Sequence, residues 1–349
     1  MTDNAVLAAN IGREGAARAL ATIEAGGGRL LSGPGAVLLG RTQRALREDA
    51  AIEGVVLLGG VDVVPSRILL TVPPEMRALA TTRGVMARER DRLQVWTDDS
   101  YGDKDDDGVP ELPVSRIPDG KSAALVLRAL TKASPVQGQG RALGVRNSER
   151  PFADAVFAML DGTARMFRCE SDLPGLPPYP LDARSLYLML HGHWREGHVF
   201  RGENEDGYPE AFSAKEIPDP APSVVFSGCC YGALAGMLPA RDAHSGAPQE
   251  GRKVEDSIAL TCLLYGTNAF VGCTAIHYSP DKPPFTYLGE PMHRLFWQEI
   301  AGGHPPARAL LNAKTKYASG IPHLAGGSAD LTLIEHKIFQ QFTCLGLGW

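Results

Sequence analysis

The residues of this 349-residue sequence with the clearest chemical potential are three histidines and two adjacent cysteines. His191, His193 and His198 are three of the nine histidines, and they closely follow the apolar run "LYLML". Cys229 and Cys230 end a second apolar run, "SVVFSG", 38 positions (229 minus 191) beyond His191. An imidazole beside a thiol forms a base–nucleophile pair, because it accepts the thiol proton. We therefore take these two segments as the candidate site.

The strands that carry these residues determine whether they meet. Both apolar runs have strand length, and the carboxyl ends of parallel strands form the crevice in which ligands bind. His191 and Cys229 are therefore predicted to face each other at one edge of a sheet. Gly192 would let a substrate backbone approach, and the glycines that flank the cysteines would leave backbone N–H groups for an oxyanion. The pattern alone leaves a buried structural cysteine pair as an equal alternative.

Helical and strand patterns alternate along the chain. Apolar residues at helical spacing predict a first helix that stops at the glycines 26–28, and "VVLL" at 55–58 predicts a short buried strand. The second half predicts strands at 185–190, 223–227 and 268–273 and helices near 152–160, 254–265 and 288–301. This alternation is typical of a parallel α/β sheet. We expect a smaller N-terminal α/β subdomain, residues 1–138, before a catalytic subdomain, residues 139–349.

Composition argues against several classes of function. The chain is 44% hydrophobic and 21% charged with a net charge of −5, so a surface for nucleic acid or anionic membrane is not expected. The apolar runs are far shorter than a membrane span, and the N-terminus lacks the pattern of a signal peptide. Six scattered cysteines indicate free thiols in a reducing cytosol, so we expect a cytoplasmic protein.

The two chemical segments resemble those of a known family. "YLMLHG" followed by "VVFSGCCYG" is similar to the paired blocks of caspase-like (clan CD) cysteine peptidases. The second block is closest to the Ser-small-Cys-x-x-Gly form of the CHAT-type and gingipain-like (C25) members, in which Cys229 would be the nucleophile and His191 the base. Cys230 is the alternative nucleophile, because Cys230-Tyr231-Gly232 fits the Cys-x-Gly form of the caspases.

Three further blocks occur in the family's order. "DDSYGDKDDDGVPELPVSRIP" (98–118) is similar to an acidic segment of the gingipain-like family, although Ser115 stands where glycine is usual. "YGTNAFVGCTAIHYSP" (265–280) resembles the strand after the nucleophile helix, and "FWQEIAGGHPPARALLNAKTKYA" (296–318) resembles the helix–Gly–helix ending. The resemblance implies a caspase-like, mostly parallel sheet flanked by helices, with residues 1–138 as the counterpart of the gingipain A part.

The resemblance also implies an activity, that of a cysteine endopeptidase acting through a thioester. His191 would take the proton of Cys229, and the N–H groups of Gly192 and Cys229 would hold the oxyanion. Glu111, in the acidic segment, would orient His191 as a third member, and a strand-edge carboxylate with no part in catalysis is the alternative for this residue. A catalytically silent caspase-like scaffold or regulatory module is the alternative from another class.

Many relatives cleave after a basic residue, so an acidic pocket for the P1 side chain is expected. Asp98 and Asp99 are the candidate carboxylates. Trp194, beside the histidine segment, would either line the cleft or simply pack there. The acidic stretch 203–206 and Asp256 are alternatives for the same pocket. The expected partners are a protein or peptide substrate and a regulatory protein, and analogy suggests a bacterial source.

Metal ions have two candidate places. Asp103, Asp105 and Asp107 alternate as in the first half of a calcium-binding EF-hand loop, but the twelfth position is Val114. This favours an optional calcium ion in a loop of another kind, or a solvated acidic turn. A zinc site from His191, His193 and His198 is a weaker alternative, because few further ligands are available. No cofactor is required by the predicted reaction.

Overall fold

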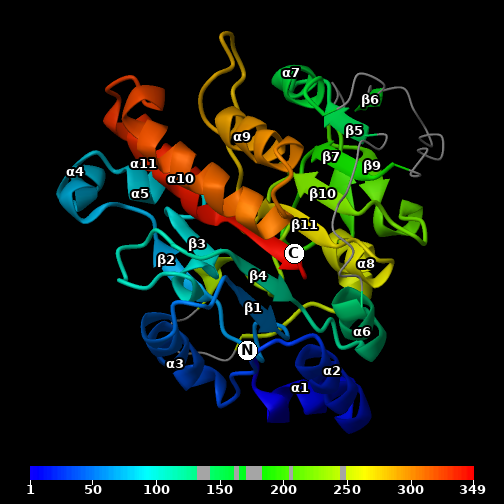
Figure 1. The fold of residues 1–349 in the computed structure, drawn as a ribbon. Coiled ribbons are helices and arrows are strands. Elements are labelled where there is room, and N and C mark those ends of the chain that lie inside the picture. Colours follow the sequence, from blue (N-terminus) through cyan, green and yellow to red (C-terminus); the bar gives the residue numbers. More distant parts are fainter. Residues whose placement is uncertain (132–141, 161–164, 170–182, 204–206, 244–248) are drawn as a thin grey trace.

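The computed structural model describes residues 1–131, 142–160, 165–169, 183–203, 207–243 and 249–349. Eight strands form one central sheet, in which six of the seven neighbouring pairs are parallel (Figure 1). Their order across the sheet is β1 (Val55–Leu58), β4 (Val114–Ile117), β12 (Phe342–Gly346), β11 (Ala269–Cys273), β10 (Val224–Ser227), β7 (Ser185–Met189), β5 (Ala142–Asn147) and β6 (Arg165–Cys169). The predicted mostly parallel α/β architecture is confirmed.

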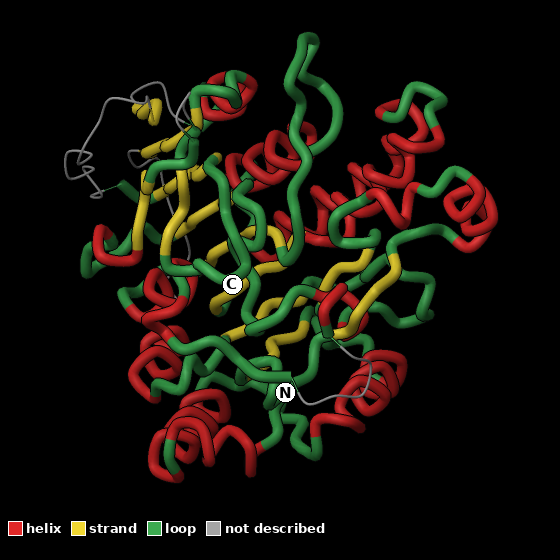
Figure 2. The backbone as a smooth tube through the Cα atoms, turned by 180° about the vertical axis from the view of Figure 1, so that it is seen from behind, coloured by secondary structure: helices red, strands yellow, loops and turns green. Residues whose placement is uncertain are grey.

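Helices cover both faces of this sheet, and Figure 2 shows the strands between them. One face packs against α1 (Asn4–Ile11), α2 (Arg13–Ala25), α3 (Gly35–Glu48), α6 (Ala123–Thr131) and α8 (Ile258–Leu264). The other packs against α7 (Phe152–Phe157), α9 (Glu290–Ala301), α10 (Pro306–Leu324) and α11 (Ala329–Gln341). None of the helices in the described ranges is long and apolar enough to cross a bilayer.

Two small hairpins lie outside the central sheet. One pairs β2 (Arg67–Leu70) with β3 (Gln94–Thr97), with α4 (Arg77–Thr82) and α5 (Val85–Arg88) in the connection. The other pairs β8 (Val199–Arg201) with β9 (Glu210–Ser213) and follows β7 directly along the chain.

The central strands form where the sequence is continuously apolar. Every residue of β10 and β11 is buried, as expected for strands covered by helices on both faces. In register, Ser227 of β10 lies opposite Leu188 of β7 on one side and Gly272 of β11 on the other. The segments that follow β7, β10 and β11 therefore emerge at one edge of the sheet.

The antiparallel pair of β11 and β12 divides the sheet into two parallel blocks. Both β1 and β4 come from residues 1–138, and they join the rest of the sheet through β12 at the C-terminus. The two predicted subdomains thus contribute strands to the same sheet. The predicted boundary between residues 138 and 139 lies outside the described residues.

Most predicted elements agree with the structure to within a few residues. Two helices differ for local reasons. The predicted helix 254–265 is a 3₁₀ turn, Val254–Asp256, followed by α8, because the Ser257 side chain accepts a hydrogen bond from Leu260 N–H and starts a new helix. The helix α1 was not predicted, and Asp3 caps it in the same way.

Candidate active site

His191 follows β7 and is held by two contacts. Its backbone bridges to Arg201, with each N–H donating to the other's carbonyl at 2.8 Å. Two residues further on, Glu203 Oε2 lies 2.8 Å from His191 Nε2, and buried Asn147 donates to the same oxygen at 3.1 Å. An ionised carboxylate only accepts hydrogen bonds, so Nε2 carries the proton and Nδ1 presents its lone pair.

Glu203, the carboxylate that contacts His191, belongs to a stretch for which the sequence predicts a different role. Its stretch 203–206 was considered for the substrate pocket, and residues 204–206 lie outside the described residues. Burial alone would raise the pKa of Glu203, but the hydrogen bond and charge of His191 hold it below the usual range. The sequence "HGHWREGHVFRGE" shows that a carboxylate follows His191. It does not predict the backbone bridge between His191 and Arg201, which places that carboxylate beside the imidazole.

The two adjacent cysteines have different environments. Cys229 is 0% exposed, packs in the core, and its Sγ accepts a hydrogen bond from Leu190 N–H at 3.3 Å. Burial raises the pKa of the Cys229 thiol to about 12. Cys230 is partly exposed, and its Sγ accepts a hydrogen bond from His277 N–H at 3.3 Å. Burial raises the pKa of Cys230 as well, and that backbone N–H opposes the rise.

The backbone of Gly192 lies directly against Cys230. A Cβ atom at Gly192 would stand 1.9 Å from the Cys230 carbonyl oxygen, so only glycine fits there. The N–H of Cys229, a predicted oxyanion donor, donates instead to Ser227 Oγ at 3.3 Å. Within the described ranges, the N–H groups of Gly192 and Cys230 have no acceptor.

Glu111 lies on the acidic loop before β4, four strand positions from β7 in the sheet. That separation is about 19 Å at the usual strand spacing. Its Oε2 accepts a hydrogen bond from Lys104 N–H at 2.7 Å, and the carboxylate that contacts His191 is Glu203. The ligand oxygens of Asp103, Asp105, Asp107 and Glu111 all lie within 4.8 Å of one another.

Asp98 and Asp99, the predicted pocket carboxylates, are both paired with cations inside the protein. Arg116 donates to the two oxygens of Asp98 at 2.7 and 2.8 Å. Burial alone would raise the pKa of Asp98, but Arg116 holds it below the usual range. Asp99 pairs with the buried Lys314; burial raises the pKa of Asp99, and Lys314 offsets only part of the rise. Both carboxylates therefore belong to structural ion pairs.

Trp194 is partly exposed and packs in one apolar cluster with Cys230 and Tyr231. His193 and His198 are exposed. Among the described residues, no grouping of three possible metal ligands includes any of the histidines 191, 193 and 198. Of the three histidines, His191 lies against a carboxylate, that of Glu203. It also adjoins Gly192, which lies against the turn after β10 that contains Cys229 and Cys230.

His277 and His293 form a buried pair behind that turn. Their Nε2 atoms are 2.9 Å apart, and a Cβ atom at Gly228 would stand 2.5 Å from His293 Cε1. Tyr187 Oη lies 2.7 Å from His293 Nδ1, and Gln341 Nε2 lies 3.0 Å from His277 Nδ1. Burial lowers the pKa of His277 to about 3 and that of His293 well below its usual value.

This pair is expected to make the protein less stable in mild acid. As the pH falls below about 6.5, the unfolded chain binds a proton at each histidine and the native protein does not, so the free energy of unfolding decreases. We expect a loss of about 3 kcal/mol from about pH 7.5 to about pH 5.5, measured by urea titration. In the double variant His277→Gln/His293→Gln, the free energy of unfolding should decrease less over this pH range. In His323→Gln, which changes an exposed histidine, it should decrease as much as in the wild type. An unchanged pH dependence in the double variant would contradict this assignment.

No protein-family model matches the sequence, and no curated protein matches it. Several solved structures resemble it in part or in whole. A protease structure aligns with a TM-score of 0.51 and 13% identity, over 90% of this chain and 67% of that chain. Two structures of the Saccharomyces cerevisiae separase–securin complex align with TM-scores of 0.41 and 0.40 and 11% identity, over 68% of this chain; they match 14% of the length of the separase-complex chain. This chain therefore has the fold of a protease of known structure.

Proposed function

We propose that this protein is a caspase-like cysteine endopeptidase with Cys230 as its nucleophile. The observation that carries the proposal is the meeting of two segments at one sheet edge. The backbone of Cys230, whose thiol is partly exposed, lies against Gly192, and the strand that precedes Cys230 pairs with the strand that precedes His191. His191 has its Nε2 on Glu203 and its Nδ1 available as a base. The fold shared with a protease supports the same class.

In the proposed reaction, His191 Nδ1 takes the proton from Cys230 Sγ, and the thiolate attacks the carbonyl carbon of the scissile peptide. The N–H groups of Gly192 and Cys230 bind the oxyanion. His191 then gives its proton to the leaving amine as the C–N bond breaks and a thioester remains. Water, deprotonated by His191, hydrolyses the thioester and restores the thiol. Glu203 stabilises the imidazolium form of His191.

The alternative from another class is a catalytically silent scaffold with the same fold. Reaction of the folded protein with a peptidyl electrophile separates the two. The peptidase proposal expects a single covalent adduct, on Cys230, together with cleavage of a peptide library. Absence of labelling at every pH tested would leave the scaffold as the function.

We further propose a basic P1 residue, supported by the resemblance to gingipain-like enzymes. The group that would recognise it is not Asp98 or Asp99, because both are engaged with Arg116 and Lys314. The same library profile decides this point: enrichment of arginine or lysine before the cleaved bond supports it, and enrichment of acidic or apolar residues refutes it.

We also propose that calcium, which the reaction does not require, binds at the acidic loop. The carboxylates of Asp103, Asp105, Asp107 and Glu111 lie close enough together to share one ion that takes several oxygen ligands. Calcium in hundredfold excess over its Kd would stabilise the native protein by about 2.7 kcal/mol, seen as a higher unfolding temperature. Asp105→Asn should remove this gain and Asp106→Asn should keep it. An equal gain in both variants would place the ion elsewhere.

A further inference from the structure

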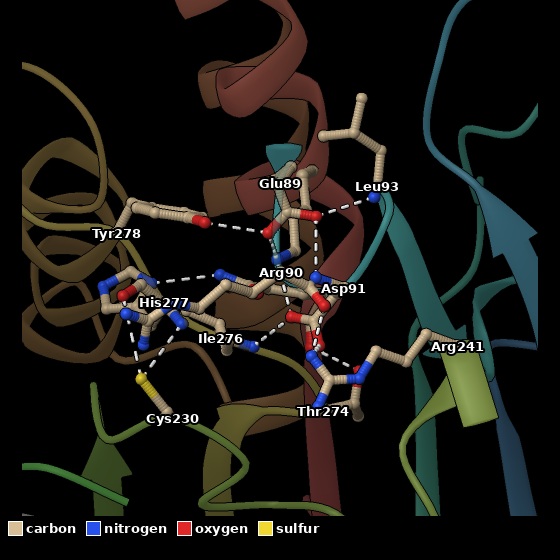
Figure 3. Close-up of polar contacts among 12 residues, drawn as sticks. Glu89, Arg90, Asp91, Leu93, Cys230, Arg241, Thr274, Ile276, His277 and Tyr278 are labelled. Carbon is tan, nitrogen blue, oxygen red and sulfur yellow. Dashed lines mark hydrogen bonds and ion pairs between the residues drawn. The ribbon is translucent and has the colours of Figure 1, made fainter. Parts of the chain in front are cut away.

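We infer that Asp91 is a positioning residue for Cys230, a single buried carboxylate that holds the chain on both sides of the thiol (Figure 3). The Tyr231 hydroxyl donates to Asp91 Oδ1 at 2.6 Å, and Ile276 N–H donates to Oδ2 at 2.7 Å. Tyr231 follows Cys230 directly, and Ile276 precedes His277, whose N–H donates to the Cys230 sulfur. The inference rests on the proposed function, in which Cys230 is the nucleophile.

The first contact holds an unfavourable backbone conformation. Tyr231 has a φ of 57°, in the left-handed region that side chains disfavour. Its N–H donates to the Ala275 carbonyl at 3.0 Å, and its hydroxyl reaches Asp91 at the far end of the side chain. Residues in such conformations persist only where the surroundings determine them. Because the turn at Tyr231 sets the direction of the preceding residue, the Asp91 contact helps to aim Cys230.

The second contact holds the donor that faces the sulfur. The segment after β11 carries Ile276 and His277, and Figure 3 shows His277 beside Cys230 with Ile276 facing Asp91. The His277 N–H lies 3.3 Å from Cys230 Sγ and favours the thiolate form. A shift of Ile276 would move this N–H away from the sulfur.

The charges around Asp91 keep it in place. Lys337 of α11 is 0% exposed and lies 2.7 Å from Asp91 and 2.6 Å from Glu89. Arg241 lies 3.7 Å from the other oxygen of Asp91 and donates to the Arg90 carbonyl. Two buried carboxylates thus face the buried Lys337 and the partly exposed Arg241. Removing one member of such a group leaves a buried charge without its partner, which is costly. Asp91 contacts the chain around Cys230 and not the sulfur, so its role is to position.

Alkylation of Cys230 by iodoacetamide, followed by mass spectrometry of the full chain, tests the inference. In Asp91→Asn one acceptor oxygen is replaced by a donor, so Tyr231 or Ile276 loses its partner. We expect the alkylation rate at neutral pH to fall about tenfold or more. This loss is part of the roughly 10²- to 10⁴-fold rate enhancement that a correctly positioned base contributes. Tyr231→Phe, which removes one donor, should show a smaller fall. In peptide cleavage, kcat should fall while KM stays near the wild-type value.

Glu335→Gln is the matched control. Glu335 is buried and accepts a tyrosine hydroxyl, from Tyr317, and a backbone N–H, from Leu288, the same kinds of donor that Asp91 accepts. This variant should lose stability but keep the alkylation rate. Wild-type rates in Asp91→Asn and Tyr231→Phe, or an equal loss in Glu335→Gln, would overturn the inference. If Asp91→Asn does not fold, Tyr231→Phe decides alone.

The alkylation readout needs no substrate, which separates this inference from the proposed function. A wild-type protein that is alkylated but cleaves no peptide would refute the peptidase proposal. The comparison between Asp91→Asn and Glu335→Gln would still show whether Asp91 positions the thiol.

Discussion

Cys230→Ala is expected to abolish peptide cleavage and labelling by a peptidyl electrophile, whereas Cys229→Ala should change both by no more than roughly threefold. Removing a catalytic nucleophile costs on the order of 10⁶-fold in kcat in a well-studied serine peptidase. Cys229 is 0% exposed, and burial raises its pKa to about 12, so its thiolate is unavailable near neutral pH. Cys230 is partly exposed and receives a hydrogen bond on its sulfur.

The adduct is located by mass spectrometry of peptides from the labelled protein. Cys262→Ala is the matched control for Cys229→Ala, because Cys262 is also buried in the core. Both should lower the unfolding temperature and leave the active thiol intact. A labelled Cys229, with cleavage that survives in Cys230→Ala, would assign the nucleophile to Cys229, as the resemblance to gingipain-like enzymes implies.

His191→Ala is expected to lower kcat/KM by roughly 10²- to 10⁴-fold, the range that a positioned general base contributes. Glu203→Gln should lower it less, by roughly tenfold or more, because glutamine keeps a hydrogen bond to Nε2 but no charge to stabilise the imidazolium. Asn147 donates to the same Glu203 oxygen, so Asn147→Ala should produce a smaller loss in the same direction.

Cleavage of one fluorogenic peptide by all variants, with circular dichroism to verify folding, measures these effects. Glu210→Gln, at the exposed first residue of β9 in the same hairpin, is the control for glutamate substitution and should behave as wild type. Two glutamates are candidates for the third member, and the comparison separates them. A greater loss in Glu111→Gln than in Glu203→Gln would restore Glu111 to that role.

Much of the frame could be predicted from local patterns. Continuous apolar runs of strand length mark β7, β10 and β11, since strands covered on both faces require them. The order of these runs places His191 and the cysteine pair at one edge, because the carboxyl ends of neighbouring parallel strands coincide. The antiparallel contact of β11 with β12 was not predictable, because it depends on a pairing between distant segments.

Which of several similar carboxylates belongs to the candidate site depends on tertiary contacts, and no local sequence pattern indicates these contacts. Asp98 resembles a pocket carboxylate in sequence, yet Arg116 from the neighbouring segment neutralises it. In the sequence, Glu203 is one of several acidic residues in the stretch 203–206. The backbone bridge between His191 and Arg201 places it next to the His191 imidazole. The Asp98–Arg116 ion pair and the Glu203–His191 contact both require a loop to bring two segments together. The path of such a loop depends on long-range packing.

The sequence by itself determined the strands, the histidine and the two cysteines that end them, because hydrophobic period and strand length are local properties. Only the tertiary structure decided which sulfur is accessible. Adjacent side chains point in different directions. The turn at Tyr231, with its hydroxyl on Asp91, leaves Cys229 in the core and Cys230 beside Gly192. The carboxylate that accepts this hydroxyl lies 140 residues upstream (231 minus 91).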